Sequence, residues 1–330
     1  MACGSYSPLD RPLTEVGPGF SNGTSESSGY RVVAIVVTFH PTRRKLEQVL
    51  QAVRSQAQGV VIVDNTPAGG ADLGDFSSTD DRVAVIQNRQ NVGLAAAQNQ
   101  GIRWSAARGF THVFMLDQDS VPDPECVARL YEAARGLANK GFAVAAVGPC
   151  VLDNRTGRAY SFKRFTFAGI KHGYCSAGTD VIRADFVIAS GSLIEMESLR
   201  VIGPMDDGLF IDRIDIDWCL RAAAMGRAVY GVCAARLRHE PGERSSRIWI
   251  GRWTEVAVHS PERTYYMIRN SIMLYRKAYA PLRWIVNDAI WLFGVVLLSC
   301  MVAPARMRRL GFVCKGIRDG LLRIQGPLVQ

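Results

Sequence analysis

The sequence predicts an α/β protein with a mainly parallel central sheet, flanked by helices and followed by further helices at the C-terminus. Apolar, β-branched runs alternate with segments of helical periodicity, and polar residues follow directly after the apolar runs. Strands separated by helices form parallel sheets through right-handed crossovers. With 330 residues, of which 48% are hydrophobic and 21% charged, the chain has the composition of a globular protein with a full core.

The elements follow from two patterns. Val32–Thr38 (VVAIVVT) is apolar without alternation, which is typical of a strand buried on both faces. Arg43–Arg54 repeats apolar residues at the spacing of one helix face. The patterns continue, and we expect strands at Val60–Asp64, Val83–Ile86, Thr111–Leu116 and Val144–Val147, and helices at Gly93–Arg108 and Asp123–Ala138.

Polar side chains gather where these strands end. Thr38 and Asp64 close the first two strands, and Asn88 to Asn91 follow the third. Ligands of parallel sheets gather at the carboxyl ends of the strands. A loop after a strand is often polar in any case, but polar ends on four strands together favour a binding site.

The fourth strand ends in two aspartates, in the stretch FMLDQDS. Asp117 and Asp119 would lie about 6–7 Å apart along an extended backbone. Carboxylates this close raise each other's pKa unless a cation lies beside them. Mg²⁺ or Mn²⁺ takes one or two carboxylates and completes its shell with water and phosphate oxygens. We therefore predict that this pair holds a divalent cation and presents it to a diphosphate.

The sequence lacks the common nucleotide-binding loops. A Rossmann dehydrogenase would need a GxGxxG fingerprint after its first strand, and a P-loop enzyme would need GxxxxGK[ST]; neither is present. Asp64 is instead placed to hydrogen-bond a nucleotide base or ribose at the end of the second strand.

A second acidic stretch, LFIDRIDIDWCLRA, covers residues 209–222. Asp217 and Arg221 are spaced i,i+4 on a helix, so we expect them to form a structural ion pair. Asp212 and Asp215 remain as candidates for a general base. Further along, His239 ends the strand-like segment Val229–Leu237 and is a candidate third metal ligand.

These motifs resemble glycosyltransferase family 2, whose members have the GT-A fold, and most of all its bacterial dTDP-L-rhamnose-dependent rhamnosyltransferases. The resemblance covers residues 31 to about 280, in the family's order. Its motifs are VVTFHP (36–41), VDNT (63–66), NVGLAAAQNQGI (91–102), MLDQDS (115–120), ASGSL (189–193), LFIDRIDIDWCLRA (209–222), RHEPG (238–242) and RTYYMIRN (263–270).

The resemblance implies a role for each matching residue. Asp215 would deprotonate the acceptor, and Asp119 and His239 would bind Mg²⁺ or Mn²⁺. The remaining implied sites are donor binding by Thr38, Asp64, Asn91, Asn99, Asp117 and Asp119, and acceptor or phosphate binding by Ser190, Gly191, Arg263 and Arg269. Two positions depart from the family pattern: His40 replaces an asparagine, and Ile214 replaces a glutamate.

The positive charge lies in the C-terminal part of the chain. Residues 241–330 contain 14 basic and 5 acidic side chains, which accounts for the whole net charge of +9. The apolar run Ala289–Ala303 is shorter than the roughly 20 residues of a spanning helix, and the basic run from Arg306 to Arg323 follows it. This pattern favours an anchor at the surface of an anionic membrane over a helical pair packed on the catalytic domain, and it does not favour nucleic acid.

We expect three regions: a disordered tail at 1–29, a GT-A catalytic domain at 30–260 and a helical, membrane-associated region at 261–330. The tail has neither a basic n-region nor an apolar h-region, so it does not resemble a signal peptide. The eight cysteines are scattered without a CxxC pair, as reduced thiols of a cytoplasmic protein would be. We place the protein in the cytoplasm, at the inner face of the cytoplasmic membrane.

The sequence thus predicts an inverting glycosyltransferase that moves L-rhamnose from dTDP-L-rhamnose to a lipid-linked glycan or glycolipid. Such a product would belong to a cell-surface polysaccharide or a rhamnolipid. Two alternatives remain: a sugar-nucleotide nucleotidyltransferase, and a non-catalytic relative that binds glycan or membrane. The first would need a glycine-rich loop that TFHPTRR lacks, and retention of Asp119, Asp215 and His239 disfavours the second.

Overall fold

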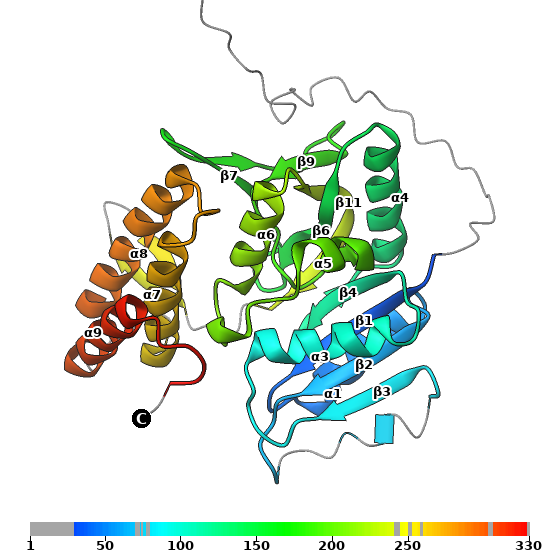
Figure 1. The fold of residues 1–330 in the computed structure, drawn as a ribbon, viewed down its shortest axis with the longest axis horizontal. Helices are drawn as coiled ribbons and strands as arrows, with labels where there is room; N and C mark the ends of the chain where they lie inside the picture. Colours follow the sequence, from blue (N-terminus) through cyan, green and yellow to red (C-terminus); the bar gives the residue numbers. More distant parts are fainter. Residues whose placement is uncertain are drawn as a thin grey trace, which may run out of the picture.

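The structure is a computed structural model, and it describes residues 30–69, 73, 75–76, 80–240, 245–249, 253–257, 260–302 and 306–328. The tail predicted at 1–29 lies outside these residues. Figure 1 shows a central sheet with helices on both of its faces and a separate group of helices beside it. The α/β class and the mainly parallel sheet predicted from the sequence are confirmed.

Nine strands form the main sheet, in the order β3-β2-β1-β4-β10-β6-β11-β5, with β9 paired to β11. Strands β1 to β4 are parallel, β6 is parallel to β11, and the inserted strand β10 is antiparallel to both of its neighbours. The bounds are β1 Val32–Thr38, β2 Gly59–Asp64, β3 Val83–Gln87, β4 His112–Asp117, β5 Ser120–Pro122, β6 Val144–Asp153, β9 Val181–Ala184, β10 Leu193–Glu195 and β11 Ala228–His239.

Two hydrophobic clusters, one on each face of the sheet, form the core. One contains apolar side chains of α3, α5 and α6, and the other contains those of α1 and α4. The sheet therefore lies between two helical layers. The helices are α1 Arg43–Arg54, α3 Leu94–Ala106, α4 Cys126–Asn139, α5 Met196–Ile202 and α6 Ile214–Ala224.

Every strand and helix expected in the first 150 residues is present, and β1 and α1 have the predicted bounds. The short strands β5, β9 and β10 were not predicted. Two hairpins outside the main sheet were also missed; they consist of β7 Phe162–Thr166 with β8 Gly169–Gly173, and β12 Ser245–Trp249 with β13 Trp253–Ala257.

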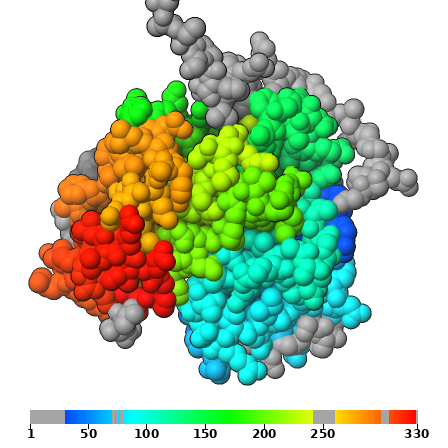
Figure 2. Space-filling model, viewed as in Figure 1, coloured from blue at the N-terminus to red at the C-terminus, as the bar shows by residue number. Residues whose placement is uncertain are grey.

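The C-terminal part consists of α7 Pro261–Tyr275, α8 Leu282–Val302 and α9 Arg306–Leu322. Helix α9 packs closely on α7, and glycines at the contact permit this approach. A Cβ at Gly316 or Gly320 would lie 2.9 Å from a carbonyl oxygen of α7. Figure 2 shows this block against the part of the chain that contains α6. Among the residues that the structure describes, the helices are too short or too polar to cross a membrane.

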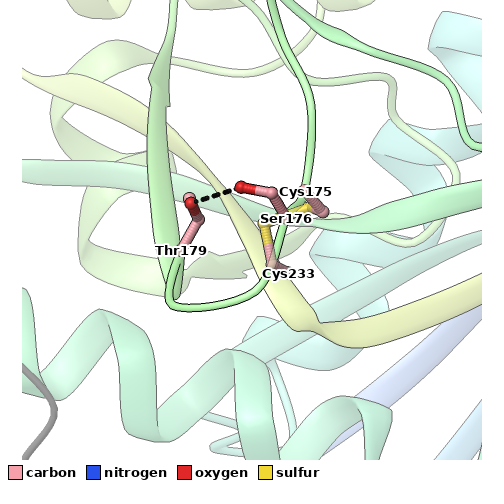
Figure 3. Close-up of a disulfide and its surroundings, with 4 residues drawn as sticks. All are labelled: Cys175, Ser176, Thr179 and Cys233. Carbon is pink, nitrogen blue, oxygen red and sulfur yellow. Dashed lines mark hydrogen bonds between the residues drawn. A yellow bond between two sulfur atoms is a disulfide. The ribbon is translucent and has the colours of Figure 1, made fainter.

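A disulfide joins Cys175 to Cys233 (Figure 3). The expectation that all cysteines are reduced thiols is therefore wrong for this pair. The two residues are 58 positions apart, and the bond ties the loop between β8 and β9 to β11. Sequence spacing alone could not indicate this contact because it depends on the packing of β9 against β11. The free cysteines among the described residues are Cys126, Cys150, Cys219 and Cys314.

Candidate active site

The carboxyl ends of three neighbouring strands bring the predicted donor residues together. In the parallel register, Thr38 of β1 lies beside Asp64 of β2, and Val37 lies beside Asp117 of β4. The Thr38 hydroxyl donates to the Asp64 carboxylate at 2.7 Å, and Thr66 donates to the same oxygen, also at 2.7 Å. Asp64 is nearly fully buried. These two hydrogen bonds fix its carboxylate at the rim of the sheet.

Asp117, Asp119 and His239 form one cluster, in which one ligand atom of each lies within 4.8 Å of the others. Strands β5 and β11 create this proximity because their antiparallel register places Ser120 opposite His239. His239 Nδ1 lies 2.9 Å from the Ser120 hydroxyl and 3.5 Å from an Asp119 oxygen. Two carboxylates with an imidazole form a donor set that suits a divalent cation. The residues present thus fit a metal site.

The pKa values of the two aspartates in this cluster are both raised, as expected for neighbouring carboxylates without a bound cation. Burial, followed by the neighbouring charge of Asp119, raises the pKa of Asp117 to about 6. Burial also raises the pKa of Asp119, although His239 acts in the opposite direction. Both carboxylates therefore ionise less readily than free aspartates. A bound cation would favour their charged forms.

The loop before α6 carries the two candidate bases in an unusual backbone conformation. Phe210, Asp212 and Arg213 all have φ between 64° and 66°, a region that non-glycine residues rarely adopt. Asp215 lies in the first turn of α6, where burial raises its pKa while the Ile216 N–H and Arg213 lower it. The chemistry of a general base is thus available at Asp215, since a raised pKa strengthens its affinity for a proton.

Asp212 and Asp217 both have cationic partners. Arg263 of α7 contacts the Asp212 carboxylate at 3.0–3.2 Å. The predicted ion pair of Asp217 with Arg221 is confirmed at 3.0 Å, and Asp217 also accepts a hydrogen bond from Tyr279. Within the described part of the chain, Asp215 forms no such ion pair; its carboxylate accepts from the Ile216 N–H at 2.9 Å.

Comparison with known proteins identifies the chain. The model of the family "Glycosyl transferase family 2" matches residues 34–192, which contain β1 to β4 and the Asp117–Asp119 pair. The chain is also 28% identical to the dTDP-rhamnosyl transferase RfbF of Shigella flexneri, over 89% of this chain and 96% of RfbF. Residues 34–192 thus match glycosyltransferase family 2. The chain is a glycosyltransferase that resembles a rhamnosyltransferase over nearly its whole length.

Two further relatives of this glycosyltransferase have mannose in their names. It is 30% identical to an undecaprenyl-phosphate mannosyltransferase of Micrococcus luteus, over 30% of this chain and 44% of that protein. It is 24% identical to a polyprenol monophosphomannose synthase of Mycolicibacterium smegmatis, over 57% of this chain and 71% of that protein.

Solved structures agree with the GT-A fold of the glycosyltransferase. GalNAc-T7 crystallised with UDP, GalNAc and Mn²⁺ superimposes with a TM-score of 0.56 at 14% identity, over 91% of this chain and 57% of that one. Staphylococcus aureus TarS superimposes with a TM-score of 0.53 at 12% identity, over 89% and 49%. At these identities the likeness shows the fold alone.

Ser190 and Gly191 of the glycosyltransferase lie next to the acidic cluster and help to position it. The Ser190 hydroxyl accepts from the Asp117 N–H at 3.0 Å and donates to Ser120 at 2.8 Å. Gly191 has φ of 86°, and a Cβ there would lie 2.7 Å from Pro149. Both residues are buried. Their contacts position the acidic cluster, and the acceptor or phosphate contact expected of them stays a prediction.

Two other predicted residues of the glycosyltransferase have structural partners. Asn99 is buried and binds the backbone of Met205 through both its amide nitrogen and its oxygen. Arg269 is fully buried and donates to the carbonyl oxygens of Gly208, Leu209 and Gly326. The sequence does not reveal these partners because they come from distant parts of the chain. We therefore leave Asn99 and Arg269 out of the proposed contacts with donor or phosphate.

The remaining donor candidate, Asn91, lies at the rim before α3. Its side-chain oxygen accepts from the Gly93 N–H at 3.0 Å, so it shapes the turn into that helix. Sequence analysis missed Gln118, whose amide bonds both the N–H and the carbonyl of Phe39, at 2.8 and 3.2 Å. These bonds join the loop after β1 to the Asp117–Asp119 turn. The position of Gln118 between the two aspartates was the only sign in the sequence that it belongs to the site.

Proposed function

We propose that the protein is an inverting rhamnosyltransferase that uses dTDP-L-rhamnose and a lipid-linked glycan or glycolipid acceptor. The observation that carries this proposal is the similarity to RfbF, which spans 96% of that protein and is named for dTDP-rhamnosyl transfer. The names of two mannosyltransferase relatives refer to undecaprenyl phosphate and polyprenol, which supports a lipid-linked acceptor. The product would then belong to a cell-surface polysaccharide or a rhamnolipid.

We propose residues 30–260 as the catalytic domain, with the donor at the rim described above. Asp64, fixed by Thr38, would bind the base or ribose of the nucleotide, and Asn91 would line the same pocket. Asp117, Asp119 and His239 would hold Mg²⁺ or Mn²⁺, and this ion would neutralise charge on the diphosphate. The donor set supports such an ion, and the GalNAc-T7 structure contains Mn²⁺ in a similar fold.

The proposed catalytic residue is Asp215. Its carboxylate would take the proton of the acceptor hydroxyl as the hydroxyl oxygen attacks the anomeric carbon of the sugar. Attack from the face opposite the nucleotide breaks the bond between that carbon and the diphosphate, releases dTDP and inverts the configuration at the carbon. Arg263 would pair with Asp212 and so keep this carboxylate out of the reaction. Arg263 would also lie at the edge of the site, where it could bind a phosphate of the acceptor.

We propose that residues 261–330 bring the enzyme to an anionic membrane, at the inner face of the cytoplasmic membrane. Val286, Ile290, Phe293 and Leu297 form an exposed apolar stripe on α8, and Ile290 and Phe293 are each 69% exposed. Met307, Leu310, Ile317 and Leu321 form another on α9. Apolar stripes beside basic side chains are typical of helices that lie at a lipid surface.

The test is transfer with purified protein, dTDP-L-rhamnose, Mn²⁺ or Mg²⁺ and a panel of lipid-linked or glycolipid acceptors. We expect dTDP release that depends on the acceptor, and a product with inverted anomeric configuration in its NMR spectrum. Pyrophosphate chemistry with a nucleoside triphosphate would instead identify a nucleotidyltransferase. Absence of turnover with every sugar nucleotide, despite binding, would identify a non-catalytic relative.

A further inference from the structure

The loop that leads into α6 is held by the C-terminal helices. Asn270 of α7 donates its amide hydrogens to the carbonyl oxygens of Leu209, Ile211 and Asp212, at 2.8–2.9 Å. Figure 1 shows α7 and α8 beside α6. Left-handed backbone at consecutive non-glycine residues persists only where surrounding contacts fix it, and these hydrogen bonds supply such contacts. The C-terminal helices therefore determine the path of the chain toward Asp215.

Arg213, two residues before Asp215, makes further contacts with these helices. Its Nε donates to the Ser271 hydroxyl of α7 at 3.0 Å, and its terminal nitrogen lies 2.8 Å from the Asp288 carboxylate of α8. The side chains of Arg213 and Asp288 are only 11% and 5% exposed. The other Asp288 oxygen accepts from the Tyr275 hydroxyl at 2.7 Å. An apolar helix thus carries one buried carboxylate, and that carboxylate points to the loop of the candidate base.

We propose that the Arg213–Asp288 ion pair is a positioning device that sets the Asp215 carboxylate for proton transfer, so that α8 is part of the active site. This inference rests on the proposed role of Asp215. Arg213 is the last residue before α6, so its side chain fixes the first turn, in which Asp215 lies. Arg213 also lies close enough to lower the pKa of Asp215 against the larger effect of burial.

The same helix exposes the apolar stripe proposed to meet the membrane. Asp288 lies on the inner side of α8, between the buried Trp284 and the buried Leu292, whereas Ile290 and Phe293 are exposed. A shift of α8 at a lipid surface would therefore reach the loop of Asp215 through one ion pair. Geometry within about 1 Å matters for such a base, because a misplacement of that size can lower a rate about 100-fold.

The chain supplies a matched control for Asp288. Asp319 of α9 is also a buried carboxylate, and it also accepts from a tyrosine of α7, Tyr265, at 2.8 Å. Within the described part of the chain, the Asp319 carboxylate bonds to Tyr265 and Arg318 and forms no hydrogen bond or ion pair with the 208–213 loop. Asp288→Asn and Asp319→Asn remove the same charge from similar surroundings, and only the first reaches Arg213.

The experiment measures kcat and KM of rhamnosyl transfer for both variants, with dTDP affinity and thermal unfolding as checks on donor binding and folding. For Asp288→Asn we expect kcat to fall about tenfold or more, with dTDP affinity near wild type. Asp319→Asn should keep kcat within about twofold. If Asp288→Asn does not fold, Tyr275→Phe and Tyr265→Phe make the same comparison by removing only a hydroxyl. Equal kcat in the two members of a folded pair would overturn the proposal.

A second measurement asks whether Asp288 acts through Asp215. Asp288→Asn is added to Asp215→Asn, and the residual rate is compared with that of Asp215→Asn alone. If Asp288 acts by positioning Asp215, its replacement should lower the rate little further once Asp215 is already replaced. If Asp288→Asn causes an independent structural defect, it should lower the rate of Asp215→Asn by the same factor as it lowers that of the wild type. Additive losses would overturn the proposal. Failure of the wild type to transfer any sugar would instead overturn the proposed function.

Discussion

Arg263 holds Asp212 by contacts of 3.0–3.2 Å between its guanidinium and the carboxylate. This contact separates two aspartates that the sequence leaves equivalent as candidate bases. The guanidinium engages the Asp212 carboxylate in an ion pair, whereas burial raises the pKa of Asp215. We therefore keep Asp215 as the proposed base and infer that Asp212 anchors α7.

Replacement of the proposed base should therefore stop transfer without loss of the fold. Asp215→Asn keeps the size of the side chain and its hydrogen bond to Ile216 but cannot accept a proton at neutral pH. We expect the turnover number to fall by about 10²–10⁴, with dTDP affinity near wild type in calorimetry. Asp212→Asn should lose less turnover and more stability. An inactive Asp212→Asn beside an active Asp215→Asn would reverse the two assignments.

Donor binding should require a divalent cation held by the acidic cluster. Calorimetric affinity for dTDP should disappear with EDTA and return with Mn²⁺ or Mg²⁺, because the cation screens the diphosphate from Asp117 and Asp119. Asp119→Asn and His239→Ala should weaken this metal-dependent binding at least tenfold. Asp123→Asn is the control, since Asp123 lies nearby but pairs with Arg238. Equal binding with and without metal would contradict the metal assignment.

The sequence predicts the rim of the site better than it predicts the contacts behind it. Thr38, Asp64, Asp117 and Asp119 are found together because strand order and parallel register follow from local patterns. His239 joins them through the β5–β11 pairing, although β5 was not predicted as a strand. Periodicity and strand ends thus contain enough information to locate a site at one edge of a sheet.

Burial is what the sequence could not supply. Arg269 lies in a motif with two tyrosines and Arg263, and it looks available to a phosphate until the structure shows carbonyl oxygens around it. Asp288 looks like a charge that interrupts a membrane segment, yet it pairs with Arg213 from a distant part of the chain. The Cys175–Cys233 disulfide is missed for the same reason. Each of these contacts joins elements whose packing no local pattern encodes.

Without metal, Asp117 should cost the protein stability at neutral pH. Burial raises the pKa of Asp117 to about 6, whereas an unfolded aspartate has a value of 3.8. Between these values the native state binds more protons than the unfolded state, so the free energy of unfolding falls as pH rises and the loss is complete above about 6. The shift corresponds to about 3 kcal/mol at most. Asp117→Asn should therefore stabilise the metal-free protein at pH 7.

Urea unfolding in EDTA at pH 5 and pH 7 tests this expectation. The gain from Asp117→Asn should be larger at pH 7, and Mn²⁺ should raise the stability of the wild type more than that of the variant. The same variant should bind dTDP more weakly in the presence of Mn²⁺. A wild type that is more stable than Asp117→Asn at pH 7 without metal would show that the carboxylate makes favourable contacts that outweigh its burial.

Binding to anionic vesicles should depend on the exposed stripe of α8. Ile290→Glu with Phe293→Glu places two charges on this stripe, so we expect sedimentation with vesicles that contain phosphatidylglycerol to fall several-fold. Both side chains are 69% exposed, which leaves the core of the helical block intact. Deletion of the region from Trp284 would be a poorer test, since Trp284 is buried and Asp288 holds Arg213.

Met225→Glu is the control for this last prediction. Met225 is 53% exposed at the C-terminal end of α6, so its replacement changes the charge of the protein without changing the stripe. Its sedimentation should stay at the wild-type level. Binding should also weaken with added salt, since the basic residues near the stripe attract anionic headgroups over about a Debye length, roughly 10 Å at 0.1 M salt. A wild-type protein that stays in the supernatant at low salt would mean that the two stripes meet something other than a membrane.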